Sequence, residues 1–596
     1  MKKLFISIIA LISVSSFAQL YVSSNNYVFV RDNVLYVNQG INLQTDGNIY
    51  LRNEAQLVQG TLGTSTNVGA GKLSVFQEGT SDNFDYNYWS SPIGNASASV
   101  GNEPFGITLL NRPTTLTAST QAIALPYDYA LNGVANPLQI ASRWVYRFVA
   151  SSAYAQWIYA GGTTTILPGE GFTMKGTSGT DNLNIEGNGV LNNPGGTGAQ
   201  RYDFRGKPND GNIPVTVALN NSTLTGNPYP SALHVNAFLL DPLNTSINRI
   251  AYYWEQDKSI NSHYLDQYRG GYGTYAPTAL ASTGIYVPAY FNSYNADGSL
   301  NTTGTVSSGS TVNRKYAPIG QGFMVYGTAN GTVTLRNSHR AYYKESGPFS
   351  GFERNSNAQN SITVQDSVIE TSHIRINTIL NNEFTKQIAL AFLPEATDGI
   401  DPGIDAISFI SDVPNDTYFF LDNTEYTIQG IPFDVSKRVA LGVKSSEGST
   451  LKFYIAETVN FDESQDVFIY DALDESYHSI KNNEYEVTMS AGVFNNRFEV
   501  TFTDNSALGV PEINTIDFMV SQNNALETLT IHNPKLRDVQ TVSIFDIGGK
   551  RIFKKENLQA NETYQFSTSG FSTGVYILKM TTKEEITLTQ KVIISK

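Results

Sequence analysis

Two short stretches have residue types and spacings that could do chemistry. The first, GFSTG at residues 570–574, has the spacing of a hydrolase nucleophile elbow, in which a serine lies on a strained turn between a strand and a helix. The residues that follow, VYILKM, alternate as a strand does. No histidine follows Ser572 in the chain, so the usual order of that catalytic triad is impossible. We interpret the stretch as a turn that leads into a strand.

The second stretch, TDGIDPGIDA at residues 397–406, carries Asp398, Asp401 and Asp405 in a turn that contains glycine and proline. Convergent carboxylate oxygens suit calcium, which takes about six to eight oxygen ligands. The three aspartates are a candidate calcium site, with solvated turn acids as the favoured alternative because no complete EF-hand pattern is present. We expect no other cofactor, since the chain has no cysteine and its six histidines show no paired metal spacing.

Aromatic residues are concentrated in one part of the chain. Residues 19–360 hold 26 of the 34 tyrosines and all four tryptophans, Trp89, Trp144, Trp157 and Trp254, on a nearly uncharged background. Amphipathic rings among Asn, Ser and Thr suit sugar faces and flat protein partners, although each single Trp is better explained as part of a β core. A nucleic-acid partner is not expected, because the net charge is −14.

The elements that must position these residues are β-strands. The chain has 34 Tyr, 31 Phe and 49 Gly with only 15% charged residues, which favours pleated surfaces joined by turns. The net charge is −1 over residues 19–360, −16 over residues 361–510 and +3 over residues 521–596, which predicts separately folded units. We therefore expect an all-β multidomain protein with a β-solenoid-like or β-meander segment at 19–85, a central domain at 86–345, an acidic β-sandwich at 361–510 and a small β domain at 521–596.

The central domain contains an internal repeat of short motifs. YWSSPIG (88–94) precedes LPGEGF (167–172), and TGNPYPS (225–231) precedes PIGQGF (318–323). The prolines are offset by 136 residues and the phenylalanines by 151, which predicts a duplicated β unit with loops of different length. Glycines two residues apart before a Phe fit a tight turn that delivers an aromatic ring into a core strand. We expect Phe172 and Phe323 to be buried at equivalent positions.

The N-terminus carries an export signal. Lys2 and Lys3 precede an apolar run from Leu4 to Ile12 and small residues up to Ala18, which is typical of a signal peptide at residues 1–18. A transmembrane segment is not expected, because a span needs about 20 apolar residues and this run is roughly half that length. Attachment through a lipid-modified cysteine is excluded, since the chain has none.

The C-terminus resembles the C-terminal sorting domain of the type IX secretion system of Bacteroidetes, in its type A form. The resemblance rests on VSIFDIGGKRIF (542–553), FSTGVYILKM (571–580) and TQKVIISK (589–596), while the usual Pro-Asn-Pro is replaced by IHNPKL (531–536). It implies an immunoglobulin-like sandwich that an outer-membrane translocon recognises, and a protein that is secreted or held at the outer cell surface. It also implies the following sorting-signal residues: Gly548, Gly549, Lys550, Gly574, Val575, Tyr576 and Lys591.

Besides a purely structural role in a surface layer, two function classes stay open. Export signals together with the lack of a catalytic constellation favour a binding or adhesion protein with a glycan or surface-protein ligand. The alternative is a secreted polysaccharide-active enzyme whose paired carboxylates lie in the central domain, since the separation of such a pair is a property of the fold.

Overall fold

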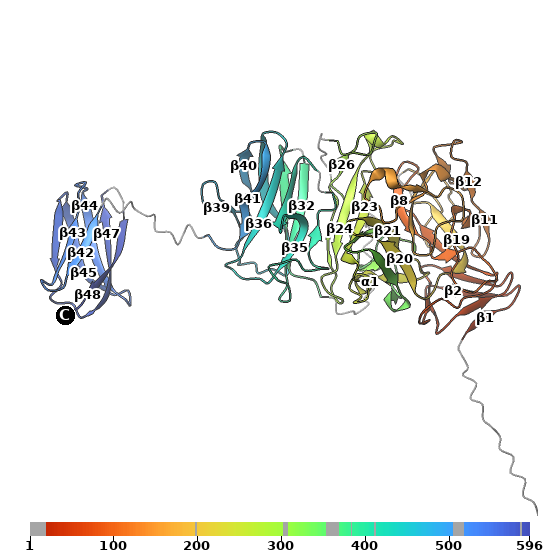
Figure 1. Cartoon of the computed structure of the whole chain (residues 1–596), viewed down its shortest axis with the longest axis horizontal. Coiled ribbons are helices and arrows are strands. Elements are labelled where there is room, and N and C mark those ends of the chain that lie inside the picture. The colour runs from red at the N-terminus through yellow and green to blue at the C-terminus, as the bar shows by residue number, and fades with distance from the viewer. Residues whose placement is uncertain are drawn as a thin grey trace, which may run out of the picture. The chain divides into compact units, whose positions relative to one another are not determined.

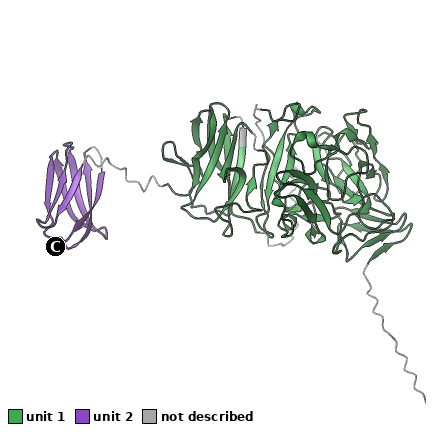
Figure 2. Ribbon diagram, in the orientation of Figure 1, with its two compact units in different colours: residues 1–503 green, residues 504–596 purple. Residues whose placement is uncertain are grey.

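The computed structural model describes residues 19–196, 199–301, 308–352, 369–382, 384–410, 413–504, 518–583 and 587–596. The predicted signal peptide and residues 361–368 of the predicted acidic sandwich lie outside these ranges. Strands hold 49% of the residues and helices 4%, which confirms the all-β class (Figure 1). The chain forms two compact units, residues 1–503 and 504–596 (Figure 2).

The first strands form parallel pairs along short coils. They are β1 Leu20–Val22 with β4 Ile41–Leu43, β2 Tyr27–Arg31 with β5 Asn48–Arg52, and β3 Val34–Val37 with β6 Gln56–Gln59. Each partner lies about one coil further along the chain, and the alternating apolar residues Ile49, Leu51 and Leu57 point into the core. Parallel pairing between strands so close in sequence is the arrangement of a solenoid, whereas a meander pairs neighbours in antiparallel fashion.

The central region contains the same four-strand unit twice. In both copies the first strand pairs with the fourth and the second with the third, all antiparallel. The first copy comprises β7 Lys72–Glu78, β8 Tyr86–Ser90, β17 Gly171–Lys175 and β19 Arg201–Pro208. The second copy comprises β20 Ile213–Val217, β21 Ser222–Gly226, β28 Gly322–Gly327 and β29 Gly331–Leu335. The repeated unit thus begins at β7, before the boundary predicted at residue 86.

The registers of the two copies correspond residue by residue. Ser90 lies opposite Gly171 in the first copy, and Gly226 lies opposite Gly322 in the second. Ser90 and Gly226 are 136 residues apart, and Gly171 and Gly322 are 151 residues apart, which are the two offsets found in the sequence. Phe172 and Phe323 follow the two glycines, and both side chains are 0% exposed, as predicted.

The two copies also cross each other closely through these glycines. A Cβ atom on Gly171 would lie 2.8 Å from the carbonyl oxygen of Thr225, in the second copy. A Cβ atom on Gly322 would lie 2.7 Å from the backbone nitrogen of Trp89, in the first copy. Since Trp89 and Thr225 are themselves equivalent, the contact is reciprocal, and only a residue without Cβ permits it.

The second copy is extended by inserted strands that pack on the acidic region. Strands β23 Ile247–Gln256, β24 Arg269–Ala276 and β25 Ile285–Val287 continue the β21–β28 sheet, and the short helix α1 Val235–Leu239 packs near it. Tyr252 of β23 belongs to the same buried apolar cluster as Ala389 and Ile428 of the acidic region, and its ring lies 4.3 Å from that of Phe409.

The acidic region is one continuous sheet of eleven strands that curls into a nearly closed, barrel-like form over its own core. Among the described residues, its strand pairings are antiparallel except that between β32 and β35. Its strands are β31 His373–Leu380, β32 Phe384–Phe392, β33 Ala406–Ile407, β34 Asp416–Leu421, β35 Thr424–Ile431, β36 Arg438–Ser445, β37 Ser449–Val459, β38 Phe468–Asp471, β39 Ser476–Ser479, β40 Tyr485–Met489 and β41 Gly492–Thr501.

The boundaries predicted at 85/86 and at 345/361 do not separate compact units, because all of these parts belong to residues 1–503. The net charge of a segment reflects mainly the side chains that it exposes to solvent. It says nothing of the apolar side chains through which β23 and β25 share a core with β32 and β35.

The C-terminal unit consists of two small sheets around one apolar core. The three-stranded sheet comprises β42 Met519–Asn523, β43 Thr528–His532 and β46 Thr563–Ser567. The four-stranded sheet has the order β45-β44-β47-β48 and comprises β44 Val539–Asp546, β45 Arg551–Gln559, β47 Gly574–Thr582 and β48 Thr587–Ile594. Two antiparallel sheets face to face form a sandwich, as the resemblance implied.

Candidate functional site

A partly exposed group of four aromatic side chains and one arginine lies on the insertion between β8 and β17. We call the group Tyr127, Arg143, Trp144, Tyr146 and Tyr159 the aromatic patch. The ring centroids of Tyr127 and Tyr159 lie 5.3 Å apart at right angles, and those of Tyr146 and Tyr159 lie 5.4 Å apart. Tyr127 and Tyr159 are 42% and 45% exposed. Exposed rings that gather in this way mark interaction surfaces on soluble proteins.

Short strands position the patch. Antiparallel pairing of β15 Tyr146–Arg147 with β16 Ile158–Tyr159 places Tyr146 directly opposite Tyr159. The Arg143 guanidinium lies 4.9 Å from the Tyr127 ring centroid and 5.2 Å from that of Trp144, within cation–π range. Burial and a hydrogen bond with Tyr127 raise the pKa of Tyr146 to about 12. The Tyr146 hydroxyl is thus neutral at physiological pH, and Arg143 supplies the one charge of the patch.

A buried lysine adjoins the patch. The Lys175 ammonium lies 4.2 Å from the ring centroid of Trp144, 4.8 Å from that of Tyr86 and 4.7 Å from that of Tyr268. It donates to the Tyr268 hydroxyl and lies 3.2 Å from Nδ1 of His263, whose Nε2 lies 2.6 Å from the amide oxygen of Asn132. Three rings therefore enclose this amine, and the residue is only 3% exposed.

The protonation states of this group follow from burial. Desolvation lowers the pKa of Lys175 to about 7, against the opposing effects of Asp85 and Asp82. Desolvation, together with the charge of the nearby Asp82, also raises the pKa of Asp85 to about 7. Burial and the charges of Lys175 and Arg143 lower the pKa of His263 to about 4, so His263 is neutral and its Nδ1 accepts from Lys175. An amine with a pKa near 7 is nucleophilic in principle, but its enclosure leaves no approach for a substrate carbonyl.

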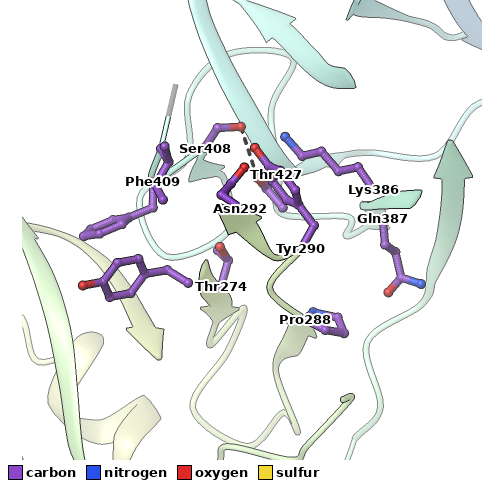
Figure 3. Close-up of a pocket in the computed structure, with 11 residues that line it drawn as sticks. Thr274, Pro288, Tyr290, Asn292, Lys386, Gln387, Ser408, Phe409 and Thr427 are labelled. Carbon is purple, nitrogen blue, oxygen red and sulfur yellow. Dashed lines mark hydrogen bonds between the residues drawn. The ribbon is translucent and has the colours of Figure 1, made fainter. Parts of the chain in front are cut away.

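A small cavity lies between strand β24 of the central region and strands β32 and β35 (Figure 3). Thr274, Tyr290, Lys386 and Thr427 line it, and Ser408 is hydrogen-bonded to Thr427 at 3.1 Å. Its volume of about 20 Å³ is close to the about 10–15 Å³ that one water molecule needs. The cavity is thus too small for an organic ligand.

The three aspartates of the calcium prediction have other partners. Asp398 accepts from the Lys437 ammonium at 2.6 Å, and Asp401 accepts from the backbone N–H of Thr397 at 2.6 Å. Asp405 accepts from the backbone N–H groups of Asp401 and Gly430, and burial raises its pKa to about 6. Within the described ranges, no group of three or more His, Asp or Glu side chains could hold a metal ion. Calcium binding stays a prediction.

Three of the four tryptophans contribute to the apolar core, as the structural interpretation expects. Trp89 is 1% exposed, and Trp157 and Trp254 pack against a buried apolar cluster, whereas Trp144 belongs to the patch. Ser572 precedes strand β47, and its carbonyl oxygen accepts from the Tyr576 hydroxyl at 3.0 Å, so it lies in a turn before a strand. The cluster around Lys175 has no sequence signal, because Asp85, Lys175 and His263 lie about 90 residues apart along the chain.

The residues of the sorting signal gather at one end of the four-stranded sheet. Gly548, Gly549 and Lys550 form the hairpin between β44 and β45, where Gly549 has a φ of +78°. The carboxylate of Asp546 accepts from the backbone N–H groups of Gly548 and Lys550. Tyr576 lies opposite Asp546, and it is flanked by Val575 and Gly574 at the start of β47. Lys591 of β48 pairs with Ile577 in the next position. The motifs are thus neighbours in space, and their role in sorting stays a prediction.

The comparison with protein families identifies this C-terminal unit. Residues 523–595 match the family described as Secretion system C-terminal sorting domain. This confirms the predicted type IX cargo protein, and such a tail implies a secreted or outer-surface location. Among the described residues, no helix has the length and apolar character that crossing a membrane requires.

Solved structures show only distant likeness. A DUF3244 family protein with an immunoglobulin-like β-sandwich fold from Bacteroides vulgatus is 20% identical over 13% of this chain and 85% of its own, with a TM-score of 0.12. The BSP domain of a biofilm associated protein is 6% identical over 76% of this chain and 87% of its own, with a TM-score of 0.11. No curated protein matches the chain. Residues 125–502, which include the patch, the second β copy and the acidic sheet, match the family described as Domain of unknown function (DUF8693), and the chain belongs to that family.

Proposed function

We propose that this type IX cargo protein acts at or beyond the cell surface as a binding protein, and that the aromatic patch contacts a neutral polysaccharide. The observation that carries the proposal is the exposure of Tyr127 and Tyr159 beside each other on a part of the chain with little charge. Exposed ring faces stack on the apolar faces of sugar rings, and neighbouring hydroxyls hydrogen-bond to the sugar hydroxyls.

Polysaccharide is favoured over a protein partner because of the form of the patch. Ser142 Oγ lies 3.2 Å from the Tyr159 hydroxyl and donates to the carbonyl of Leu125, so the rings stand among polar groups rather than in an apolar field. A protein interface of standard size has a core in which aromatic side chains are packed and fully desolvated. A ring pair with a polar neighbour at the Tyr159 hydroxyl matches a hydroxylated ligand better.

The experiment is a depletion assay with insoluble cellulose, chitin and starch. The wild-type protein should be retained by at least one of them, and the double variant Tyr127→Ala, Tyr159→Ala should bind about tenfold or more weakly, because each stacked ring is worth about 1 kcal/mol. The matched control is Tyr21→Ala, Tyr36→Ala, which removes two tyrosines of 59% and 62% exposure from the N-terminal coils and should leave binding unchanged. Retention by none of the three polysaccharides, or equal loss of binding in both double variants, would refute the proposal. Capture of a protein partner through the same two tyrosines would favour the protein alternative.

Export is tested separately. Deletion of residues 521–596 removes all strands of the C-terminal unit except the first two residues of β42. The rest of the protein should stay folded in the periplasm, because residues 1–503 form a compact unit of their own. The aromatic-patch variant, which keeps the tail, should still reach the outer surface or the medium. Normal secretion of the truncated chain would contradict the sorting assignment.

The alternative of a polysaccharide-active enzyme is tested in the same incubations. Hydrolysis would release reducing ends from the retained polysaccharide, whereas a binding protein releases none.

A further inference from the structure

A buried ion pair joins two strands of the acidic region. The Lys386 ammonium of β32 lies 2.5 Å from Oδ1 of Asp416, in β34. The side chains of Lys386 and Asp416 are 2% and 0% exposed. The ammonium also lies 5.1 Å from the ring centroid of Tyr290, which comes from the central region. The amine and the carboxyl group are therefore held in contact with each other and away from solvent.

The surrounding charges leave this pairing in place. Lys444 lies opposite Asp416 in the β34–β36 ladder, but its ammonium is paired with Glu425 at 2.5 Å. Desolvation raises the pKa of Asp416, against the charges of Lys386 and Lys444. Among the described residues, Oδ2 of Asp416 has no hydrogen-bond partner. A buried ion pair with an unmet acceptor carries a large desolvation cost, so a product without charges is favoured at this position.

The geometry of the pair suits the formation of an amide bond. A nitrogen in contact with Oδ1 is close to Cγ, the carbon that carries this oxygen, and reacting atoms about 3 to 3.5 Å apart define a near-attack arrangement. Burial favours the transfer of one proton from the ammonium to the carboxylate, because the transfer removes both charges and leaves a nucleophilic amine. Lys386 and Tyr290 also line the cavity of about 20 Å³, which has room for one water molecule (Figure 3).

We propose that Lys386 and Asp416 condense after folding into an intramolecular amide, an isopeptide bond between β32 and β34. In this step the Nζ–Cγ bond forms and the Cγ–Oδ1 bond breaks. Oδ1 receives one proton from the ammonium before the attack and a second proton from the nitrogen after it, and it leaves as water into the adjoining cavity. Oδ2 becomes the amide oxygen. The two opposite charges cancel, and no other reactant is consumed.

The bond gives this protein a covalent crosslink. It connects residues that lie 30 positions apart in the chain. A crosslink of this kind stabilises a fold chiefly by restricting the unfolded chain, as a disulfide does. Exported proteins commonly use disulfides for this purpose, but this chain has no cysteine. The isopeptide bond supplies the same restriction without a thiol.

The test is mass spectrometry of the full mature chain and of its tryptic peptides. The intact wild-type protein should be one water molecule lighter than its sequence requires, and the segments that carry Lys386 and Asp416 should be recovered joined to each other. Trypsin should fail to cleave after Lys386, because an acylated lysine has lost its charge. Lys386→Arg keeps a positive charge but removes the amine, so this variant should show no loss of water.

Lys437 and Asp398 are the matched control within the same chain. Their ammonium and carboxylate lie 2.6 Å apart, but the side chains are 24% and 68% exposed, so water keeps both groups charged and they should be recovered unlinked. The proposal is overturned if the wild-type chain has its full mass and yields the two segments separately. It is also overturned if the missing water maps elsewhere, such as to a succinimide at Asp398 and Gly399. The wild-type masses decide between these outcomes, whether or not the Lys386→Arg chain folds.

Discussion

Truncation of the two equivalent phenylalanines tests the duplicated core. Phe172 and Phe323 are both 0% exposed and follow glycines that occupy equivalent positions in the two ladders. Phe172 packs on Phe105 with ring centroids 5.2 Å apart, and Phe323 packs on Tyr253 at 5.6 Å. Replacing a fully buried Phe by Ala removes its contacts and leaves a cavity, which costs about 3 to 5 kcal/mol.

The assay is thermal unfolding of the chain without its C-terminal unit. At about 2.1 cal/mol/K per residue, a cooperative unit of roughly 480 residues has an unfolding entropy of about 1 kcal/mol/K, so a loss of 4 kcal/mol lowers the midpoint by about 4 °C. Because the two copies cross through Gly171 and Gly322, each single variant should shift one common transition. Phe433→Ala, at a site that is 42% exposed, is the control and should cost far less.

Two results would contradict the prediction of one shared core. One is a pair of separate transitions of which each variant shifts only one, since the copies would then fold independently. The other is a shift for Phe172→Ala or Phe323→Ala no larger than that of the exposed control.

The reciprocal glycine contact predicts that Gly322→Ala is destabilising by about 1 to 3 kcal/mol, because the new Cβ would lie 2.7 Å from backbone atoms of Tyr88 and Trp89 that have no room to move. Gly448→Ala, where the nearest atom would be 3.6 Å away, should be nearly neutral in the same denaturation assay. Burial lowers the pKa of Lys175 from about 10.5 in the unfolded chain to about 7 in the folded protein. The burial of this amine therefore destabilises the fold by its full amount below about pH 7, and the destabilisation disappears as the pH rises toward about 10.5. Lys175→Met should therefore raise the unfolding midpoint more at about pH 6 than at about pH 10, and an equal gain at both would contradict the pKa shift. The calcium prediction expects a higher melting midpoint with calcium than with a chelator, a difference that Asp398→Asn removes; equal midpoints for the wild type would dismiss it.

Much of the candidate site could not be predicted because it is assembled from distant segments. The count of tyrosines and tryptophans pointed to the central region, and Trp144 was among the residues singled out. No spacing in the chain indicates that Tyr127 and Tyr159 share one surface, or that Lys175 lies within reach of His263. The buried ion pairs of Arg201 with Glu78 and Glu186 are a further example, because Glu78 lies 123 positions and Glu186 15 positions from Arg201 along the chain and only the fold brings them together.

The sequence by itself determined the features that depend on local order. Alternation fixed the strand class, GxGF at two offsets identified the duplicated unit, and contiguous C-terminal motifs identified the sorting domain. These signals are local because a strand, a turn or a motif is specified by neighbours in the chain. Only the tertiary structure decided that residues 19–503 form one compact unit. Apolar contacts such as that between Tyr252 and Phe409 depend on which sheets face each other, and charge and composition do not encode that choice.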